Sequence, residues 1–178
     1  MFANRRAAGR LLAARLHQLR EEKPAVLALP RGGVAVGFEI AEGLDAPLEL
    51  VLVRKIGVPW QPELALGAVV GGANPQVLIN DILAAELAID QNYITSETAR
   101  QLEEIERRRK VYLGDRTPVP LAGRTVIVVD DGIATGSTVR TALRAVRRAG
   151  AGKIILAVPV APEDALEELR KEVGEIIA

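Results

Sequence analysis

The chain has 178 residues, 49% of them hydrophobic, and its 23 basic residues balance its 23 acidic residues. This length predicts a single domain over residues 1–178, and the balanced charge argues against nucleic acid or a membrane as a partner. The chain has no cysteine, which excludes disulfides and zinc-thiolate sites, and no apolar run reaches the ~20 residues that span a bilayer, so we expect a cytoplasmic protein.

The first twenty residues are rich in arginine, and Ala8, Leu12, Leu16 and Leu19 recur in them at helical spacing. We interpret this segment as a packing helix rather than a transit peptide, because the apolar positions form one stripe. His17, the only histidine, falls among polar residues of this helix. We therefore expect it on the surface, and we expect no Ser-His-Asp triad.

A short apolar strand begins at Ala25 and ends in a turn that contains Arg31, Gly32 and Gly33, and an apolar helix follows over residues 34–44. Glycines expose backbone N–H groups, and a forked guanidinium suits pyrophosphate. The turn is therefore a candidate phosphate loop, although ordinary turn chemistry would also explain it.

The next strand is predicted from Leu48 to its end at Arg54 and Lys55. In open α/β sheets, ligands bind at the carboxyl ends of the strands. We therefore expect these two cations to converge with the Arg31 turn on one site; the alternative is a solvated strand end.

From about residue 57 to residue 80, glycines and prolines punctuate the chain. This pattern predicts a mobile arm that carries a short hairpin. Trp60, the only tryptophan, is either a packing anchor or a stacking surface for a flat ligand, and we favour packing.

A long exposed helix is predicted after the arm, capped by Thr95 or Ser96 and ending near Leu113. Three acid-base pairs four residues apart would stabilise it. These pairs are Glu103–Arg107, Glu104–Arg108 and Glu106–Lys110. They account for the basic run at residues 107–110 without nucleic acid; the alternative is that one of these cations reaches a pyrophosphate across a subunit boundary.

The most informative stretch is the branched apolar run of residues 126–129, which is followed by Asp130, Asp131 and an amphipathic helix from Val139. A helix start offers unpaired N–H groups and a positive dipole end, so the small and hydroxylated residues before it are predicted to cradle a phosphate. They are Ala134, Thr135, Gly136, Ser137 and Thr138. Carboxylates repel phosphate, so the two aspartates are predicted to bind sugar hydroxyls or hydrated Mg²⁺.

A generic capped turn is the alternative interpretation of that loop, while a P-loop and a dinucleotide fingerprint are both missing. A fourth buried strand is predicted from residue 153 to residue 160. A helix then begins at Pro162 and ends at Gly174, and a fifth strand begins at Glu175.

The loop of residues 125–138 resembles the phosphoribosyl-pyrophosphate loop of type I phosphoribosyltransferases. The Leu-Pro-Arg-Gly-Gly turn, the Val-Arg-Lys strand end and the Pro-Glu-x-Ala-x-Gly-Ala segment at residues 62–68 resemble bacterial phosphoribosyltransferase-domain proteins. The resemblance implies an α/β fold: an open, mainly parallel five-stranded sheet with helices on both faces, and an arm inserted after the second core strand.

The resemblance also implies a Mg²⁺-dependent transfer of the phosphoribosyl group from phosphoribosyl pyrophosphate to a nucleobase-like nitrogen, with release of pyrophosphate, and we expect a homodimer. Asp130 and Asp131 would hold the ribose hydroxyls, directly or through Mg²⁺ and water, and residues 134–138 would hold the 5-phosphate. The pyrophosphate would be held by Arg31, Gly32, Gly33, Arg54 and Lys55, with Arg31 and Lys55 stabilising it as it leaves.

Two departures from the family bear on the acceptor. Ala134 stands where members that act on 6-oxopurines have an aspartate, which disfavours hypoxanthine and guanine. The family completes a base-binding hood after its last core strand, whereas this sequence ends at Ala178, so the hood is predicted to be missing or truncated. Two alternatives stay open: a non-catalytic module that binds phosphoribosyl pyrophosphate or a nucleotide, and a pyrophosphokinase-type or phosphohydrolase relative.

Overall fold

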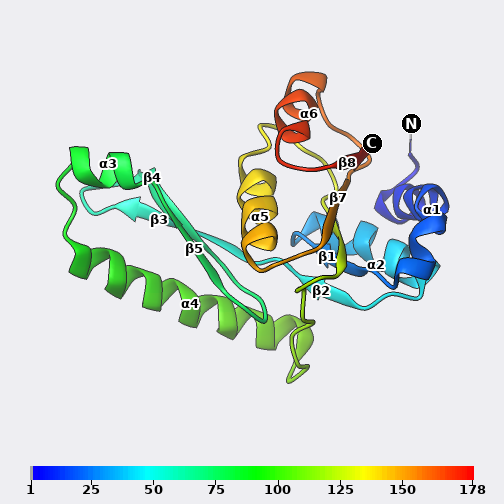
Figure 1. Ribbon diagram of the computed structural model, residues 1–178, viewed down its shortest axis with the longest axis horizontal. Helices are drawn as coiled ribbons and strands as arrows, with labels where there is room; N and C mark the ends of the chain where they lie inside the picture. Colours follow the sequence, from blue (N-terminus) through cyan, green and yellow to red (C-terminus); the bar gives the residue numbers. More distant parts are fainter. Residues whose placement is uncertain (1) are drawn as a thin grey trace.

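The computed structural model describes residues 2–178. Its main sheet has five strands in the order β2-β1-β6-β7-β8, and every neighbouring pair is parallel (Figure 1). The strands are β1 (Ala25–Ala28), β2 (Leu48–Leu50), β6 (Thr125–Val129), β7 (Lys153–Ala157) and β8 (Glu175–Ile177). The predicted open five-stranded sheet is confirmed.

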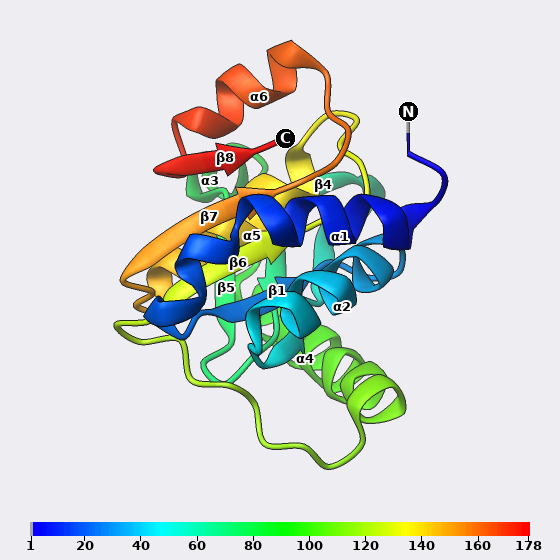
Figure 2. The same ribbon diagram turned by 90° about the vertical axis from the view of Figure 1, so that its right-hand side faces the viewer.

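The central strand β6 shows why helices cover both faces of this sheet. Val126 and Val128 face one hydrophobic core with α5 and α6, while Ile127 and Val129 face a second core with α1 and α2. All four side chains are fully buried, as the period of two in a strand requires. The helices are α1 (Arg5–Arg15), α2 (Gly32–Leu44), α5 (Ser137–Arg148) and α6 (Glu163–Arg170). Figure 2 shows α1 and α2 together in front of the sheet.

The amino-terminal segment folds as predicted. α1 is followed by a short 3-10 helix, η1 (His17–Glu22). The stripe of Ala8, Leu12, Leu16 and Leu19 is buried, and its three leucines pack in one core with α2 and the sheet. His17 is exposed, as expected. None of the helices in residues 2–178 is both long enough and apolar enough to cross a membrane.

A second, antiparallel sheet extends away from the main one (Figure 1). It consists of β3 (Val53–Val58), β4 (Gln61–Val70) and β5 (Gln76–Ile79), followed by α3 (Asp81–Glu86) and α4 (Gln91–Leu113). Its own core includes Ile56, Leu66, Val69, Ile94 and Ile105. The predicted arm is therefore larger than a short hairpin.

The prediction of one strand from Leu48 to Lys55 is wrong. The chain changes sheets between two consecutive residues: the amide of Val51 still donates to Ala28 of β1 at 2.9 Å, whereas the carbonyl of Leu52 accepts from Gly71 of the second sheet at 3.0 Å. Residues 48–53 are apolar apart from Glu49, so no glycine or proline signals the change. Arg54 and Lys55 consequently lie within β3 rather than at a tip of the main sheet.

Two further predictions, one for Trp60 and one for the start of α4, are corrected. Trp60 is 65% exposed in the turn between β3 and β4, so it does not anchor packing within this chain. α4 begins at Gln91, before the predicted caps, because Asp90 caps it by accepting a hydrogen bond from the amide of Asn92 at 2.9 Å.

The predicted ion pairs of α4 are confirmed in part. Glu104 accepts from Arg108 at 2.7 Å as predicted, and it also binds Arg107, which was assigned to Glu103. Arg109 is only 6% exposed, so the basic run is not wholly a solvated face. Its guanidinium lies 3.2 Å from Glu49 of β2, which is itself buried.

Candidate functional site

The main sheet has one crossover point, between the adjacent strands β1 and β6. Ala28 of β1 is in register with Val129 of β6, and the amide of Leu29 donates to the Val129 carbonyl at 2.9 Å. After β1 the chain continues to β2 on one side, and after β6 it continues to β7 on the other. Open α/β sheets bind ligands beyond the carboxyl ends of the strands at such a point.

Two of the loops predicted from the sequence meet at this crossover. A Cβ atom at Gly32 would lie 2.1 Å from the carboxylate of Asp131, and one at Gly33 would lie 2.8 Å from the carbonyl oxygen of Val129. Only glycine allows this approach at both positions. Arg31, which follows a cis peptide bond, is exposed to solvent in the same turn. The Arg31 turn therefore lies directly against the paired carboxylates.

The two carboxylates have different environments. Asp130 accepts a hydrogen bond from the amide of Asp131 at 2.8 Å. Burial raises the pKa of Asp130 to about 6, although that amide opposes the shift, and the adjacent Asp131 carboxylate adds to it. Within residues 2–178 no cluster of three or more His, Cys, Asp or Glu side chains could enclose a metal. Two carboxylates suit Mg²⁺, which is commonly held by one or two protein groups together with water and ligand oxygens.

The start of α5 has the features expected of a phosphate cradle. Gly136 caps the helix with a φ of +74°, a left-handed conformation that favours glycine. The first helical hydrogen bond runs from the amide of Arg140 to the carbonyl of Gly136 at 2.8 Å. In the described part of the chain, no protein group accepts a hydrogen bond from the amides of residues 134–138. These donors are available to an anion.

The structure separates the two predicted cations of β3, because consecutive strand residues point to opposite faces. Lys55 lines a cleft of about 970 Å³ that Ser137 and Thr138 also line. Arg54 lies on the other face, where it donates to the side chain of Gln101 on α4 at 2.9 Å. Lys55 thus lies with the cradle, whereas Arg54 is directed toward α4.

Sequence reasoning missed one side chain of the site. The Nε atom of Arg5, at the start of α1, lies 2.6 Å from Oδ2 of Asp131. The two residues are 126 positions apart, and only the arginine-rich composition of the first helix hinted at a cation here. Arg5 is thus a counterion of a predicted ribose-binding carboxylate.

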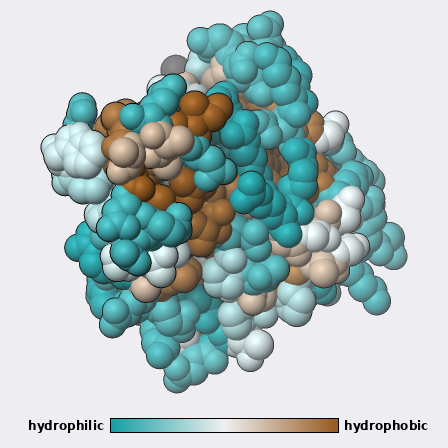
Figure 3. Space-filling view, turned by 60° about the vertical axis from the view of Figure 1, so that its left-hand side comes forward, coloured by the Kyte–Doolittle hydropathy of each residue, from teal (hydrophilic) through white to brown (hydrophobic). Residues whose placement is uncertain are grey.

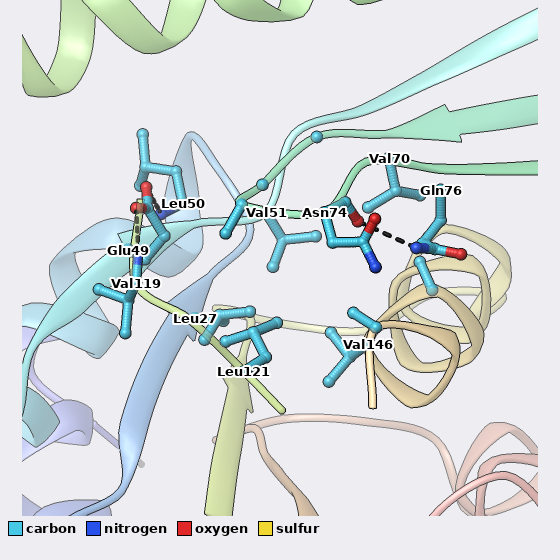
Figure 4. Close-up of a pocket in the computed structure, with 15 residues that line it drawn as sticks. Leu27, Glu49, Leu50, Val51, Val70, Asn74, Gln76, Val119, Leu121 and Val146 are labelled. Atoms are coloured by element: carbon cyan, nitrogen blue, oxygen red, sulfur yellow. Dashed lines mark hydrogen bonds between the residues drawn. The ribbon is translucent and has the colours of Figure 1, made fainter. Parts of the chain in front are cut away.

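A separate small cavity lies at the base of the second sheet and has different chemistry (Figure 4). Its walls are mainly apolar, including Leu27, Val51 and Val146, and its open volume is about 20 Å³. That volume accommodates roughly one water molecule. It is too small for a sugar phosphate, so the crossover remains the candidate site.

Comparison with known proteins agrees with this geometry. A family model described as a phosphoribosyl transferase domain matches residues 3–177. The chain belongs to this family. The resemblance inferred from its loops is thereby confirmed, and the phosphoribosyl transferase domain accounts for nearly all of the chain.

Two curated Mycobacterium tuberculosis proteins, from strains CDC 1551 and H37Rv, are provisionally named phosphoribosyl transferases and are each 42% identical to the domain over 177 residues. The match covers 99% of this chain and 40% of each relative, so the chain spans about two fifths of their length.

Among solved structures, TT1426 from Thermus thermophilus is 43% identical, with a TM-score of 0.81 over 100% of this chain and 83% of that one. AQ2163 from Aquifex aeolicus shares the fold at 14% identity, with a TM-score of 0.56 over 97% of this chain and 72% of that one.

Proposed function

We propose that this domain transfers the phosphoribosyl group of phosphoribosyl pyrophosphate to a nitrogen of a nucleobase-like acceptor, in a Mg²⁺-dependent reaction that releases pyrophosphate. One observation carries the proposal: a half-buried carboxylate pair and a helix start with free amides lie on one loop, against a second glycine loop with an exposed arginine. Membership of the phosphoribosyl transferase family supports it.

Three groups of residues bind the three parts of the donor. The amides of residues 134–138, with the hydroxyls of Thr135, Ser137 and Thr138, bind the 5-phosphate. Asp130 and Asp131 accept hydrogen bonds from the ribose hydroxyls. Because Gly32 and Gly33 lie against these carboxylates, pyrophosphate attached to the ribose would reach the Arg31 turn, where the guanidinium binds it.

Lys55 approaches the donor from the second sheet. It lines the same cleft as Ser137 and Thr138, and we assign it to stabilise pyrophosphate once the arm closes over the ligand. In this structure its ammonium group lies 3.3 Å from the exposed carboxylate of Glu63. An exposed pair of this kind contributes only about 0–1 kcal/mol, so a multiply charged ligand readily competes for the cation.

In the chemical step, the bond between the ribose anomeric carbon and the pyrophosphate oxygen breaks, and its electron pair leaves with pyrophosphate. The acceptor nitrogen donates its lone pair to the anomeric carbon and loses its proton to solvent. Mg²⁺ bound with the donor would neutralise part of the pyrophosphate charge. The protein residues hold two anionic ends in place, stabilise the leaving group and exclude water, which requires no protein nucleophile.

Ala134, which is exposed in the loop of the phosphate cradle, limits the range of possible acceptors. Since family members that act on 6-oxopurines have an aspartate there, we propose an acceptor other than hypoxanthine or guanine. We propose further that the domain acts as a homodimer in the cytoplasm, without nucleic-acid or membrane partners.

A pyrophosphate-release assay tests the proposal. The protein is incubated with phosphoribosyl pyrophosphate, Mg²⁺ and a panel of nucleobases and other amines, with the Asp130→Asn, Asp131→Asn double variant as the control. Steady release that depends on one acceptor and is lost in the control supports a transferase. Binding without release for the whole panel would favour a non-catalytic binding module, and release of ribose 5-phosphate without any base would favour a phosphohydrolase.

A further inference from the structure

The cleft beside the phosphate cradle extends well beyond it. One wall is α5, and the other is the second sheet, where Ala65, Gly67 and Ala68 of β4 are small and Leu78 and Ile79 of β5 are apolar. At about 970 Å³ the cleft is at the upper end of the range typical of small-molecule sites. Figure 3 shows this side of the molecule, where hydrophobic surface adjoins hydrophilic surface.

The α5 wall is strongly basic. Four arginines line the cleft and are called the α5 arginine face: Arg140, Arg144, Arg147 and Arg148. These four cationic side chains line the cleft with one acidic side chain, Glu172, in a protein of zero net charge. A cleft lined by one sign of charge concentrates counterions. The lining therefore favours an anionic ligand.

Part of this arginine face has a structural explanation. Arg144 donates to Glu172 at 2.9 Å, Arg147 lies 3.8 Å from the same carboxylate, and Arg148 donates to the carbonyl of Val77 at 3.1 Å. Cations in the last turn of a helix also stabilise its dipole. These contacts fix three guanidiniums along one wall, and each guanidinium has further N–H donors.

No structural contact of this kind explains the presence of Arg140 on the face. It is the fourth residue of α5, near the positive end of the helix dipole, where a cation is unfavourable. Within residues 2–178 it has neither an ion pair nor a side-chain hydrogen bond, although its charge contributes to the lowered pKa of Glu168 and Glu172. A partly buried, unpaired cation at the wrong end of a helix is a local conflict of the kind that marks binding sites.

The spacing of the four arginines along α5 indicates the length of ligand that the face would bind. Residues 140–148 span about 12 Å of helix axis at ~1.5 Å per residue. One phosphate contacts one or two of these guanidiniums, whereas a row of linked phosphates can contact the whole series. We propose that the α5 arginine face is a second anion site that binds a polyphosphate chain, either inorganic or carried by a nucleoside, alongside the phosphoribosyl donor.

Calorimetric titration of the wild-type protein with inorganic tripolyphosphate, in EDTA at ~0.15 M salt, tests this site. Arg140→Gln is the informative variant because Arg140 has no structural partner to lose. The loss of one charge-assisted contact should weaken binding about tenfold, and Arg140→Lys should restore part of it. Arg116→Gln is the matched control: it removes one exposed arginine from the loop after α4 and should leave binding unchanged.

Two further titrations distinguish the second anion site from the site that binds the phosphoribosyl donor. The Asp130→Asn, Asp131→Asn variant should lose phosphoribosyl pyrophosphate and keep tripolyphosphate. Saturating ribose 5-phosphate should not abolish tripolyphosphate binding. Equal affinities of wild type and Arg140→Gln, or complete competition by ribose 5-phosphate, would overturn the second site. Repeating the titration with ATP identifies the source: tighter binding than tripolyphosphate indicates that the apolar β5 wall contacts a nucleoside, and equal binding indicates an inorganic chain.

Discussion

Alanine substitution of the two adjacent glycines of the Arg31 turn should have opposite consequences. A Cβ atom at Gly32 would lie 2.1 Å from the carboxylate of Asp131, which is the far end of a side chain that can rotate away. At Gly33 the obstacle is the carbonyl of Val129, 2.8 Å away, which belongs to the central strand and already accepts from Leu29. One clash is relieved by moving a functional group, and the other requires backbone movement.

Gly32→Ala should therefore leave the free energy of unfolding within about 0.5 kcal/mol of wild type, because helix propensity slightly favours alanine at this helical position. Displacing Asp131 removes a charged hydrogen bond to the ribose, which is worth about 1.5–3 kcal/mol, so Mg²⁺-phosphoribosyl pyrophosphate should bind about 10- to 150-fold more weakly. Gly33→Ala should cost about 1–3 kcal/mol of stability, as overpacking does.

Urea unfolding and calorimetric titration of both variants measure these effects side by side. Donor binding by Gly32→Ala as tight as that of wild type would refute a ribose-binding role for Asp131. An equal loss of stability in Gly32→Ala and Gly33→Ala would also refute this role, because the close approach of Gly32 and Asp131 would then serve the fold rather than the ligand.

Substitutions at three other contacts give further predictions. Arg109→Met leaves the buried Glu49 without its cation and should cost about 3–5 kcal/mol in urea unfolding, whereas adding Glu49→Gln should recover part of that loss; no recovery would contradict a buried ion pair. Arg5→Gln removes an exposed counterion of Asp131, so it should change donor affinity by about fivefold or less and leave stability unchanged; complete loss of binding would show a larger role. Hydrogen bonding from Arg144 lowers the pKa of Glu172. This pair therefore stabilises the folded protein above the ordinary pKa of the carboxyl group, and the stabilisation is lost as the pH falls through the lowered value. The difference in urea midpoint between wild type and Glu172→Gln should therefore shrink in acid, and a pH-independent difference would refute this pairing.

The predictable parts of the fold carry strong local signals. Residues 126–129 are branched and apolar without interruption, so a strand covered on both faces follows from composition alone, and the glycine and hydroxyl residues after Asp131 define a loop before a helix. Parallel strands bring such loops to the same edge of a sheet. The meeting of the Arg31 turn with Asp131 could therefore be predicted, although the 2.1 Å approach at Gly32 could not.

The parts that sequence reasoning missed depend on long-range contacts. The chain leaves the main sheet between Val51 and Leu52, which form hydrogen bonds with different sheets. An unbroken apolar run in the sequence gives no signal of where this change occurs. Arg5 and Arg109 are each one arginine among many in the sequence; only the packing of α1 and α4 gives them Asp131 and Glu49 as partners.

The proposed function requires that the carboxylate pair and the start of α5 bind opposite ends of one phosphorylated pentose. Titration of Mg²⁺-phosphoribosyl pyrophosphate into wild type and into the Asp130→Asn, Asp131→Asn variant tests this most directly, with circular dichroism confirming that the variant is folded. We expect saturable binding to wild type and none to the variant over the same concentration range. Undiminished binding to the folded variant would contradict the account.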